Sequence, residues 1–313
     1  MDPEAVKREL LALLAQEDRP APAATDNPFH ASLVRLHTGK KRPFYCVHPG
    51  SGAVGCFSEI APLVDRDRTF IGVQAPGIDG EREPFNDLVA LARGYVAEIL
   101  RAQPEGPYLL GGWSLGGMVA FHMAHELRRQ GAEVALLVLF DTQRADAMHG
   151  VPFSREVAVE VLYRHNALAA EHLAFQQGVK IDREAVFRAF MRERPRSTPS
   201  RLDLMLRLLV QNGVFHDATA PMFRVFRANI LALGDYGMPV EPYDRTLTLF
   251  RCENDTLGHE YTLVDETYCW SKSVASPVEV VRMPTHHFAL FHGDVLPLTA
   301  ARLRECLDRS DPS

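Results

Sequence analysis

Residues 112–116, with the sequence GWSLG, place a serine between two glycines in a spacing that supports nucleophilic chemistry. A G-x-S-x-G sequence lets the chain turn sharply from a strand into a helix and leaves the serine hydroxyl exposed. The apolar stretch YLLGG leads into this motif and the stretch MVAFHMAHEL follows it, which is the strand and helix context that the turn needs. The sequence therefore predicts that Ser114 attacks an acyl carbonyl.

A serine hydroxyl is a weak nucleophile and needs a general base that an acidic group holds in place. In folds that use this turn, the chain order is nucleophile, acid and then histidine, so we expect the histidine near the C-terminus. His286 and His287 follow the strand-like stretch VEVVR and a proline, and the pattern leaves either of them open as the base. We interpret His122 and His125, which lie on the helix after Ser114, as packing or surface residues.

Two aspartates are candidates for the acid. Asp141 ends the apolar stretch ALLVLF, and Asp255 follows the stretch TLTLF, with Glu253 as a weaker third candidate. Active sites of open α/β sheets gather at the carboxyl ends of the strands, which is where both aspartates are expected. The residue pattern alone leaves the choice between them open.

Backbone N–H groups must also stabilise the negative oxygen that develops during attack on a carbonyl. We expect one such donor at Leu115, directly after the nucleophile. The glycine-rich segment HPGSG at residues 48–52 follows the stretch FYCV, and we expect a second donor from Gly50 or Ser51.

Apolar runs of strand length alternate with helical patterns through the first half of the chain, which predicts a parallel sheet covered by helices on both faces. The expected strands are 33–36, 44–47, 69–74, 107–112 and 135–140, and the expected helices are 88–103 and 118–130. Four helices are then expected at 155–172, 182–193, 201–211 and 220–233, before strands at 246–250 and 278–281 and a last helix at 298–309.

These elements predict an α/β-hydrolase fold, with a mostly parallel sheet, helices on both faces and an inserted helical lid. Residues 1–30 are expected to form an N-terminal helix and a linker rich in proline and alanine. Residues 31–144 and 241–313 would form the core, and residues 145–240 would form the lid over the edge of the sheet that carries the active site.

Composition narrows the class of protein further. The 313 residues carry a net charge of −6, which argues against a general nucleic-acid-binding protein. No stretch has the apolar length of a membrane span and no secretory signal is evident, so we expect no membrane partner. The five cysteines have no metal-ligand spacing, which indicates a reduced, cytoplasmic chain without a metal or other cofactor of its own.

Five segments together resemble one family, the thioesterase domains that end non-ribosomal peptide and polyketide synthases. The segments are FYCVHPGSG at 44–52, QAPG at 74–77, PYLLGGWSLGG at 107–117, LLVLFDT at 136–142 and PTHHFAL at 284–290. They occur in the family's order, and the resemblance covers the chain from about residue 43 to its end.

The resemblance implies a choice at both open positions of the site. It implies Asp141 as the acid, at the end of the strand after the nucleophile's helix, and His287 as the base, before an aromatic residue. Thr285 stands where the family usually has glycine, so this loop is expected to have a different shape. The resemblance also implies the helical lid.

The substrate implied by the resemblance is an acyl, peptidyl or polyketide chain, held as a thioester on the phosphopantetheine arm of a carrier protein. No carrier motif precedes the domain, so we expect the carrier to deliver the chain in trans. Release by hydrolysis or macrocyclisation is expected, with an editing thioesterase or an acyltransferase as alternatives. Basic residues at 40–42 and 192–196 could contact an acidic carrier, although such clusters are more often solvated surface.

Overall fold

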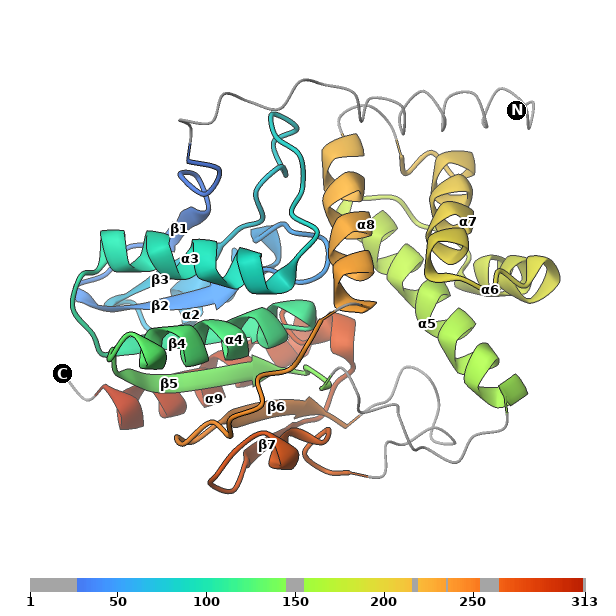
Figure 1. The fold of residues 1–313 in the computed structure, drawn as a ribbon. Coiled ribbons are helices and arrows are strands. Elements are labelled where there is room, and N and C mark those ends of the chain that lie inside the picture. Colours follow the sequence, from blue (N-terminus) through green and yellow to red (C-terminus); the bar gives the residue numbers. More distant parts are fainter. Residues whose placement is uncertain (1–26, 145–154, 216–218, 235, 254–264, 312–313) are drawn as a thin grey trace.

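The computed structural model describes residues 27–144, 155–215, 219–234, 236–253 and 265–311. The helix expected near the N-terminus, most of the linker and the alternative acid Asp255 lie outside these residues. Figure 1 shows a sheet with helices on both sides and a separate group of helices beside it. Among the described helices, none is long and apolar enough to cross a bilayer.

Seven strands form one sheet in the order β1-β3-β2-β4-β5-β6-β7. β1 pairs antiparallel with β3, and all other neighbouring strands are parallel. Their bounds are β1 Leu33–His37, β2 Lys41–Val47, β3 Arg68–Val73, β4 Tyr108–Trp113, β5 Val134–Phe140, β6 Thr248–Cys252 and β7 Glu279–Met283. This architecture is the α/β-hydrolase fold that the alternation of strands and helices predicts.

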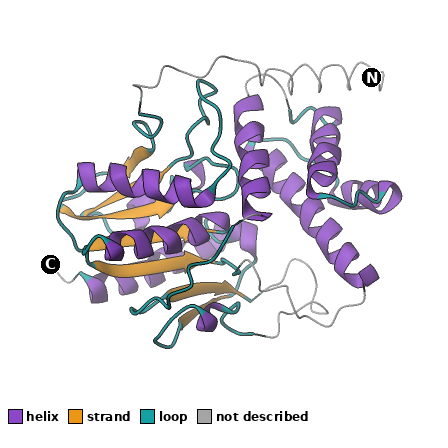
Figure 2. Cartoon of the chain, viewed as in Figure 1, coloured by secondary structure: helices purple, strands orange, loops and turns teal. Residues whose placement is uncertain are grey.

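Successive side chains of the central strands enter two different apolar clusters, one on each face of the sheet. In β4, for example, Leu110 packs under α3 (Leu88–Ala102) and α4 (Leu115–Arg129), whereas Leu109 faces α2 (Ala61–Val64) and α9 (Leu296–Ser310). Burial on both faces explains why these strands are continuous apolar runs in the sequence. Figure 2 shows the strands lying between the two layers of helices.

A group of four helices lies between β5 and β6 in the chain. Its members are α5 Arg155–Gln176, α6 Arg183–Glu193, α7 Thr198–Gln211 and α8 Ala220–Gly234. These helices have an apolar cluster of their own, which includes Phe190, Leu209 and Val214. In Figure 1 the group lies beside the edge of the sheet to which β2, β5 and β6 point, with α8 nearest the strands. We refer to α5–α8 as the helical block.

Most differences from the expected elements are shifts of a few residues at the ends. α4 begins at Leu115 rather than at residue 118, because the helix starts directly after Ser114 while two early glycines weaken its sequence signal. α7 begins at Thr198, where the Ser197 side chain accepts a hydrogen bond from the Ser200 N–H and caps the helix. The four-residue α2 was not expected from the sequence, since it is too short to show a periodicity.

Candidate active site

Ser114 lies between β4 and α4, in a backbone conformation that side chains rarely adopt, with φ of 58° and ψ of −124°. The flanking glycines are required by close backbone contacts. A Cβ added to Gly112 would lie 2.1 Å from the carbonyl oxygen of Gly116, and one added to Gly116 would lie 2.2 Å from that of His48. Any side chain at these positions would therefore force the turn apart, which explains the spacing found in the sequence.

Asp141 follows β5 directly and is buried, with 8% of its surface exposed. Its backbone φ is 45°, so this residue is also held in the left-handed region. The backbone N–H of Cys252 donates a hydrogen bond to Oδ1 at 2.9 Å, and Nδ1 of His287 donates to Oδ2 at 2.8 Å. The carboxylate is thus fixed from two sides, by the next strand of the sheet and by a histidine.

His287 lies in the loop after β7, at the start of a short 3-10 helix. Because the Asp141 carboxylate only accepts hydrogen bonds, Nδ1 of His287 carries the proton and Nε2 remains free to take one. The His287 ring also lies 5.4 Å from the ring of Trp113, the residue before Ser114. In the described part of the chain, Ser114 and His287 share no hydrogen bond, although such contacts often tighten only when substrate binds.

The alternatives that the sequence left open occupy different positions. His286 does not contact Asp141 through a hydrogen bond in the described residues, and burial lowers its pKa. Glu253 is exposed and lies 3.8 Å from Arg282, as an ion pair at the surface. Thr285 is buried and its N–H donates to the carbonyl of Met283 at 2.7 Å. The structure therefore brings His287 to Asp141.

The segment 48–52 follows β2 and lies against the first turn of α4, as the contact of His48 with Gly116 requires. The His48 side chain is fully buried, with Nδ1 donating to the Pro49 carbonyl at 2.7 Å and the Tyr95 hydroxyl 2.8 Å from Nε2. Burial lowers the pKa of His48 to about 4, so this ring stays neutral. Leu115, Gly50 and Ser51 all lie in this region, and their role as oxyanion donors stays a prediction.

The helical block reaches this loop through α8. The side-chain amide of Asn229, which is 2% exposed, donates a hydrogen bond to the Gly50 carbonyl at 3.0 Å. The ring of Phe226 also lies close to Gly50, because a Cβ added to Gly50 would be in van der Waals contact with this ring at 3.5 Å. Sequence reasoning missed Asn229, because one asparagine in a helix has no pattern that shows its partner.

Aromatic rings surround the histidine. The ring of His172, on α5, lies 4.4 Å from that of Phe288 and 5.6 Å from that of Trp113. Burial and the neighbouring histidines lower the pKa of His172 to about 3. A residue of the helical block therefore contacts the loop that carries His287, and nothing in the sequence distinguishes it from an ordinary helix histidine.

A turn at residues 265–273 contacts Asp141 and the residue that follows it. Trp270 Nε1 donates to the carbonyl of Thr142 at 2.7 Å, and Thr142 Oγ1 in turn donates to the carbonyl of Ser114 at 2.9 Å. Tyr268 donates its hydroxyl hydrogen to Asp141 Oδ1 at 3.1 Å. Thr142 ends the segment LLVLFDT, whereas Tyr268 and Trp270 lie outside the motifs found in the sequence.

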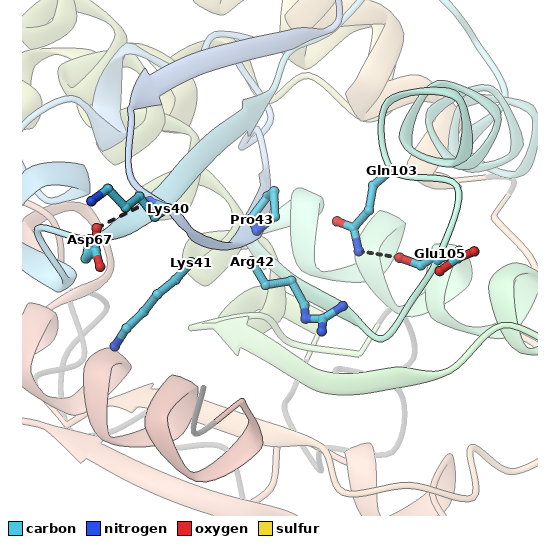
Figure 3. Close-up of a pocket in the computed structure, with 7 residues that line it drawn as sticks. All are labelled: Lys40, Lys41, Arg42, Pro43, Asp67, Gln103 and Glu105. Carbon is cyan, nitrogen blue, oxygen red and sulfur yellow. Dashed lines mark hydrogen bonds between the residues drawn. The ribbon is translucent and has the colours of Figure 1, made fainter.

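The basic residues at 40–42 line a different pocket, with Pro43, Asp67, Gln103 and Glu105 (Figure 3). They lie where β2 begins, whereas the segment 48–52 follows the other end of that strand. Lys41 pairs with Asp65 at 3.1 Å and Arg42 with Asp311 at 3.3 Å. This cluster is therefore away from Ser114 and partly neutralised.

Among the described residues, no group of three or more His, Cys, Asp or Glu side chains could hold a metal ion. All five cysteines are free thiols.

Solved structures of other proteins share this architecture. A four-domain nonribosomal peptide synthetase bound to AMP and glycine matches 97% of this chain and 21% of its own, with a TM-score of 0.66 and 23% identity. The NocB thioesterase domain in covalent complex with a fluorophosphonate nocardicin G analogue matches 88% of this chain and 100% of its own, with a TM-score of 0.57 and 24% identity. These likenesses show the shared fold.

Related sequences extend over part of the chain. The dimodular nonribosomal peptide synthase of Bacillus subtilis is 35% identical over 156 residues, which are 48% of this chain and 7% of that protein. Enterobactin synthase component F of Escherichia coli is 33% identical over 148 residues, or 47% of this chain and 11% of that protein. The chain thus spans a small part of the length of these relatives.

The family comparison covers most of the molecule and includes Ser114, Asp141 and His287. A sequence model of the thioesterase domain matches residues 42–304, from β2 to within α9. The match extends over both parts of the sheet and over the helical block between them. This chain therefore belongs to the thioesterase domain family.

Proposed function

We propose that this chain takes an acyl, peptidyl or polyketide chain from a carrier-protein thioester onto Ser114 and releases it in natural-product biosynthesis. The observation that carries this proposal is the Asp141–His287 hydrogen bond of 2.8 Å, beside a serine held at φ of 58°. Family membership supports the thioester as substrate. The names of the related synthases support a carrier protein as the partner.

In the acylation step, His287 Nε2 removes the hydroxyl proton of Ser114 as Oγ attacks the thioester carbonyl. Asp141 holds the ring through Nδ1 and stabilises the imidazolium that forms. Backbone N–H groups of Leu115 and of Gly50 or Ser51 are the proposed donors to the oxyanion. The carbon–sulfur bond then breaks, and His287 returns the proton to the departing thiolate.

In the second step, a nucleophile attacks the Ser114 ester. Water gives a free acid, whereas a hydroxyl or amine of the acyl chain itself gives a ring. His287 takes the proton of this nucleophile and passes it to Ser114 Oγ as the ester bond breaks. The helical block meets the site through apolar rings such as Phe226, so it can fold the chain back and exclude water.

The test uses the full chain and an acyl thioester on a carrier protein or a pantetheine mimic. Intact-protein mass spectrometry should detect one acyl group added to the wild type and none added to Ser114→Ala. Product masses then separate a linear acid, a ring and a group transferred to an added acceptor. If the wild type never gains acyl mass and its turnover equals that of Ser114→Ala, the proposal is wrong.

A further inference from the structure

Tyr268 makes a hydrogen bond that the mechanism above does not use. Its hydroxyl lies 3.1 Å from Asp141 Oδ1, the oxygen that does not face His287. Since an ionised carboxylate only accepts, Tyr268 is the donor. The Cys252 N–H donates to the same oxygen at 2.9 Å, and the Cys252 thiol also interacts with this carboxylate. Tyr268 supplies the only one of these that is a removable side-chain hydroxyl.

We propose that Tyr268 is a positioning residue, which holds the Asp141 carboxylate in the orientation that presents Oδ2 to His287. The inference rests on the proposed function, because it assigns Tyr268 a part in activating Ser114. It adds a residue that no sequence motif of the site contains.

The backbone around Tyr268 supports this assignment. In the part of the chain that the structure describes, five non-glycine residues have positive φ. Four of them are at the site: Ser114, Asp141, Tyr268 at 51° and Cys269 at 65°. Such conformations cost free energy and persist where the surrounding structure enforces them, most often at functional sites. Two consecutive residues with positive φ, 268 and 269, indicate that the turn is held in this conformation in order to position the Tyr268 side chain.

The turn is fixed by its own hydrogen bonds. Asp265 Oδ1 accepts from the N–H and the hydroxyl of Thr267, at 2.7 and 2.8 Å. The Tyr268 carbonyl accepts from the N–H of Arg144, at 3.3 Å. With Trp270 bound to the Thr142 carbonyl, the turn is attached to the chain directly after Asp141. The Tyr268 hydroxyl is therefore placed by the same segment that continues from the acid.

The chemical state of Tyr268 suits a permanent donor. Its side chain is buried, with 7% of the residue exposed, and burial together with the Asp141 charge raises its pKa well above the ordinary tyrosine value. The guanidinium of Arg251 lies 4.8 Å from the ring centroid and opposes this effect. The hydroxyl accordingly keeps its proton over the whole working range of pH.

Loss of this donor has two consequences. The carboxylate loses one of its hydrogen bonds, so His287 is oriented less well and kcat falls. The carboxylate charge is also less dispersed, so it interacts more strongly with the imidazolium form of His287. Because the enzyme needs neutral His287, the acid limb of the kcat/KM profile moves to higher pH. A residue that only fills space would not move that limb.

The experiment compares wild type, Tyr268→Phe and the matched control Tyr243→Phe. Tyr243 is also buried, at 1% exposed, but its hydroxyl has no hydrogen-bond partner among the described residues. We expect Tyr268→Phe to lower kcat by about 10-fold with little change in KM, as for loss of one hydrogen bond to a charged group. Its acid limb should shift upward, whereas Tyr243→Phe should match the wild type.

Two further measurements make the result decisive. The folded fraction of each protein, measured by circular dichroism at every pH of the profile, separates a shift of the acid limb from partial unfolding at low pH; His172 and His286 are unchanged in all three proteins. The rate at which a fluorophosphonate labels Ser114 reports on the triad without any thioester. A wild-type profile and labelling rate for Tyr268→Phe would overturn the inference, while a wild type that is labelled but never turns over thioesters would refute the proposed function alone.

Discussion

The sheet and the helical block border Ser114 from two sides, and they contact the site in different ways. On the sheet side, hydrogen bonds between 2.8 and 3.1 Å connect Asp141 with three partners, and the backbone is strained at the acid and the nucleophile. On the side of the helical block, the contacts are ring packing by His172 and Phe226 and one amide hydrogen bond from Asn229.

This difference separates two requirements of the reaction. Proton transfer needs atoms held at hydrogen-bond distance, and a sheet edge supplies this because its strands are fixed on both faces by packed cores. The proposed binding of an acyl chain needs apolar surface, and rings of the helical block such as Phe226 lie beside the segment 48–52. Substitutions on the two sides should therefore differ in size and in kind.

The largest expected effect lies on the sheet side, at Asp141. Asp141→Asn keeps the shape of the side chain but removes the charge and places a donor opposite His287 Nδ1. The ring then takes the wrong tautomer, and kcat should fall by about 10⁴-fold. Steady-state kinetics on a pantetheine thioester measure this.

The rival acids are the controls for that measurement. Asp255→Asn and Glu253→Gln should leave kcat nearly unchanged, and Glu253 in particular is exposed beside Arg282. A loss at Asp255 larger than the loss at Asp141 would reverse the assignment of the acid.

A smaller effect is expected on the other side, at Asn229. Asn229→Ala removes the donor to the Gly50 carbonyl, which leaves the segment 48–52, the proposed source of an oxyanion donor, less well oriented. We expect kcat to fall by about 10-fold, as for one hydrogen bond. Asn212→Ala is the matched control, since the Asn212 amide donates to Leu208 on an exposed helix end. Equal kinetics for the two variants would show that the helical block does not orient the segment 48–52.

The two sides also differ in how far the sequence predicts them. Ser114 lies in a motif whose glycines are required because an added Cβ would clash with backbone oxygens. Asp141 directly follows an apolar strand that is buried on both faces of the sheet. Both signals are local, so they mark Ser114 and Asp141 as candidates without the fold, whereas the choice of Asp141 over Asp255 rests on the family resemblance. The choice of His287 over His286 came from family resemblance, and the hydrogen bond to Asp141 now gives it a geometric basis.

The remaining site residues have no local signal. Tyr268 is 127 positions from Asp141 in the chain and lies in an irregular turn, where no periodicity points to a partner. A single tyrosine in a sequence is ordinarily interpreted as a packing residue. Only the folded structure shows that the Tyr268 hydroxyl contacts Asp141. His172 and Asn229 are single polar residues on helices of the block, and their partners depend on how the block packs against the sheet.

The smallest effect on turnover, with a clear effect on stability, is expected at His172. Phenylalanine can keep the ring contact with Phe288, so His172→Phe should change kcat little at neutral pH. The folded state holds this ring neutral, with a pKa of about 3, whereas an unfolded histidine titrates near about 6.5. Between these values the unfolded chain binds one more proton, so the wild type loses stability as the pH falls.

Urea unfolding of both proteins between neutral pH and about pH 5 tests this. The free energy of unfolding of the wild type should decrease more steeply, by up to about 1.4 kcal/mol per pH unit relative to His172→Phe. Other buried histidines such as His48 are present in both proteins, so they contribute equally and cancel in the difference. Parallel curves would mean that His172 is not held neutral between the block and the His287 loop, and the helical block would then contact the site less closely than the ring distances indicate.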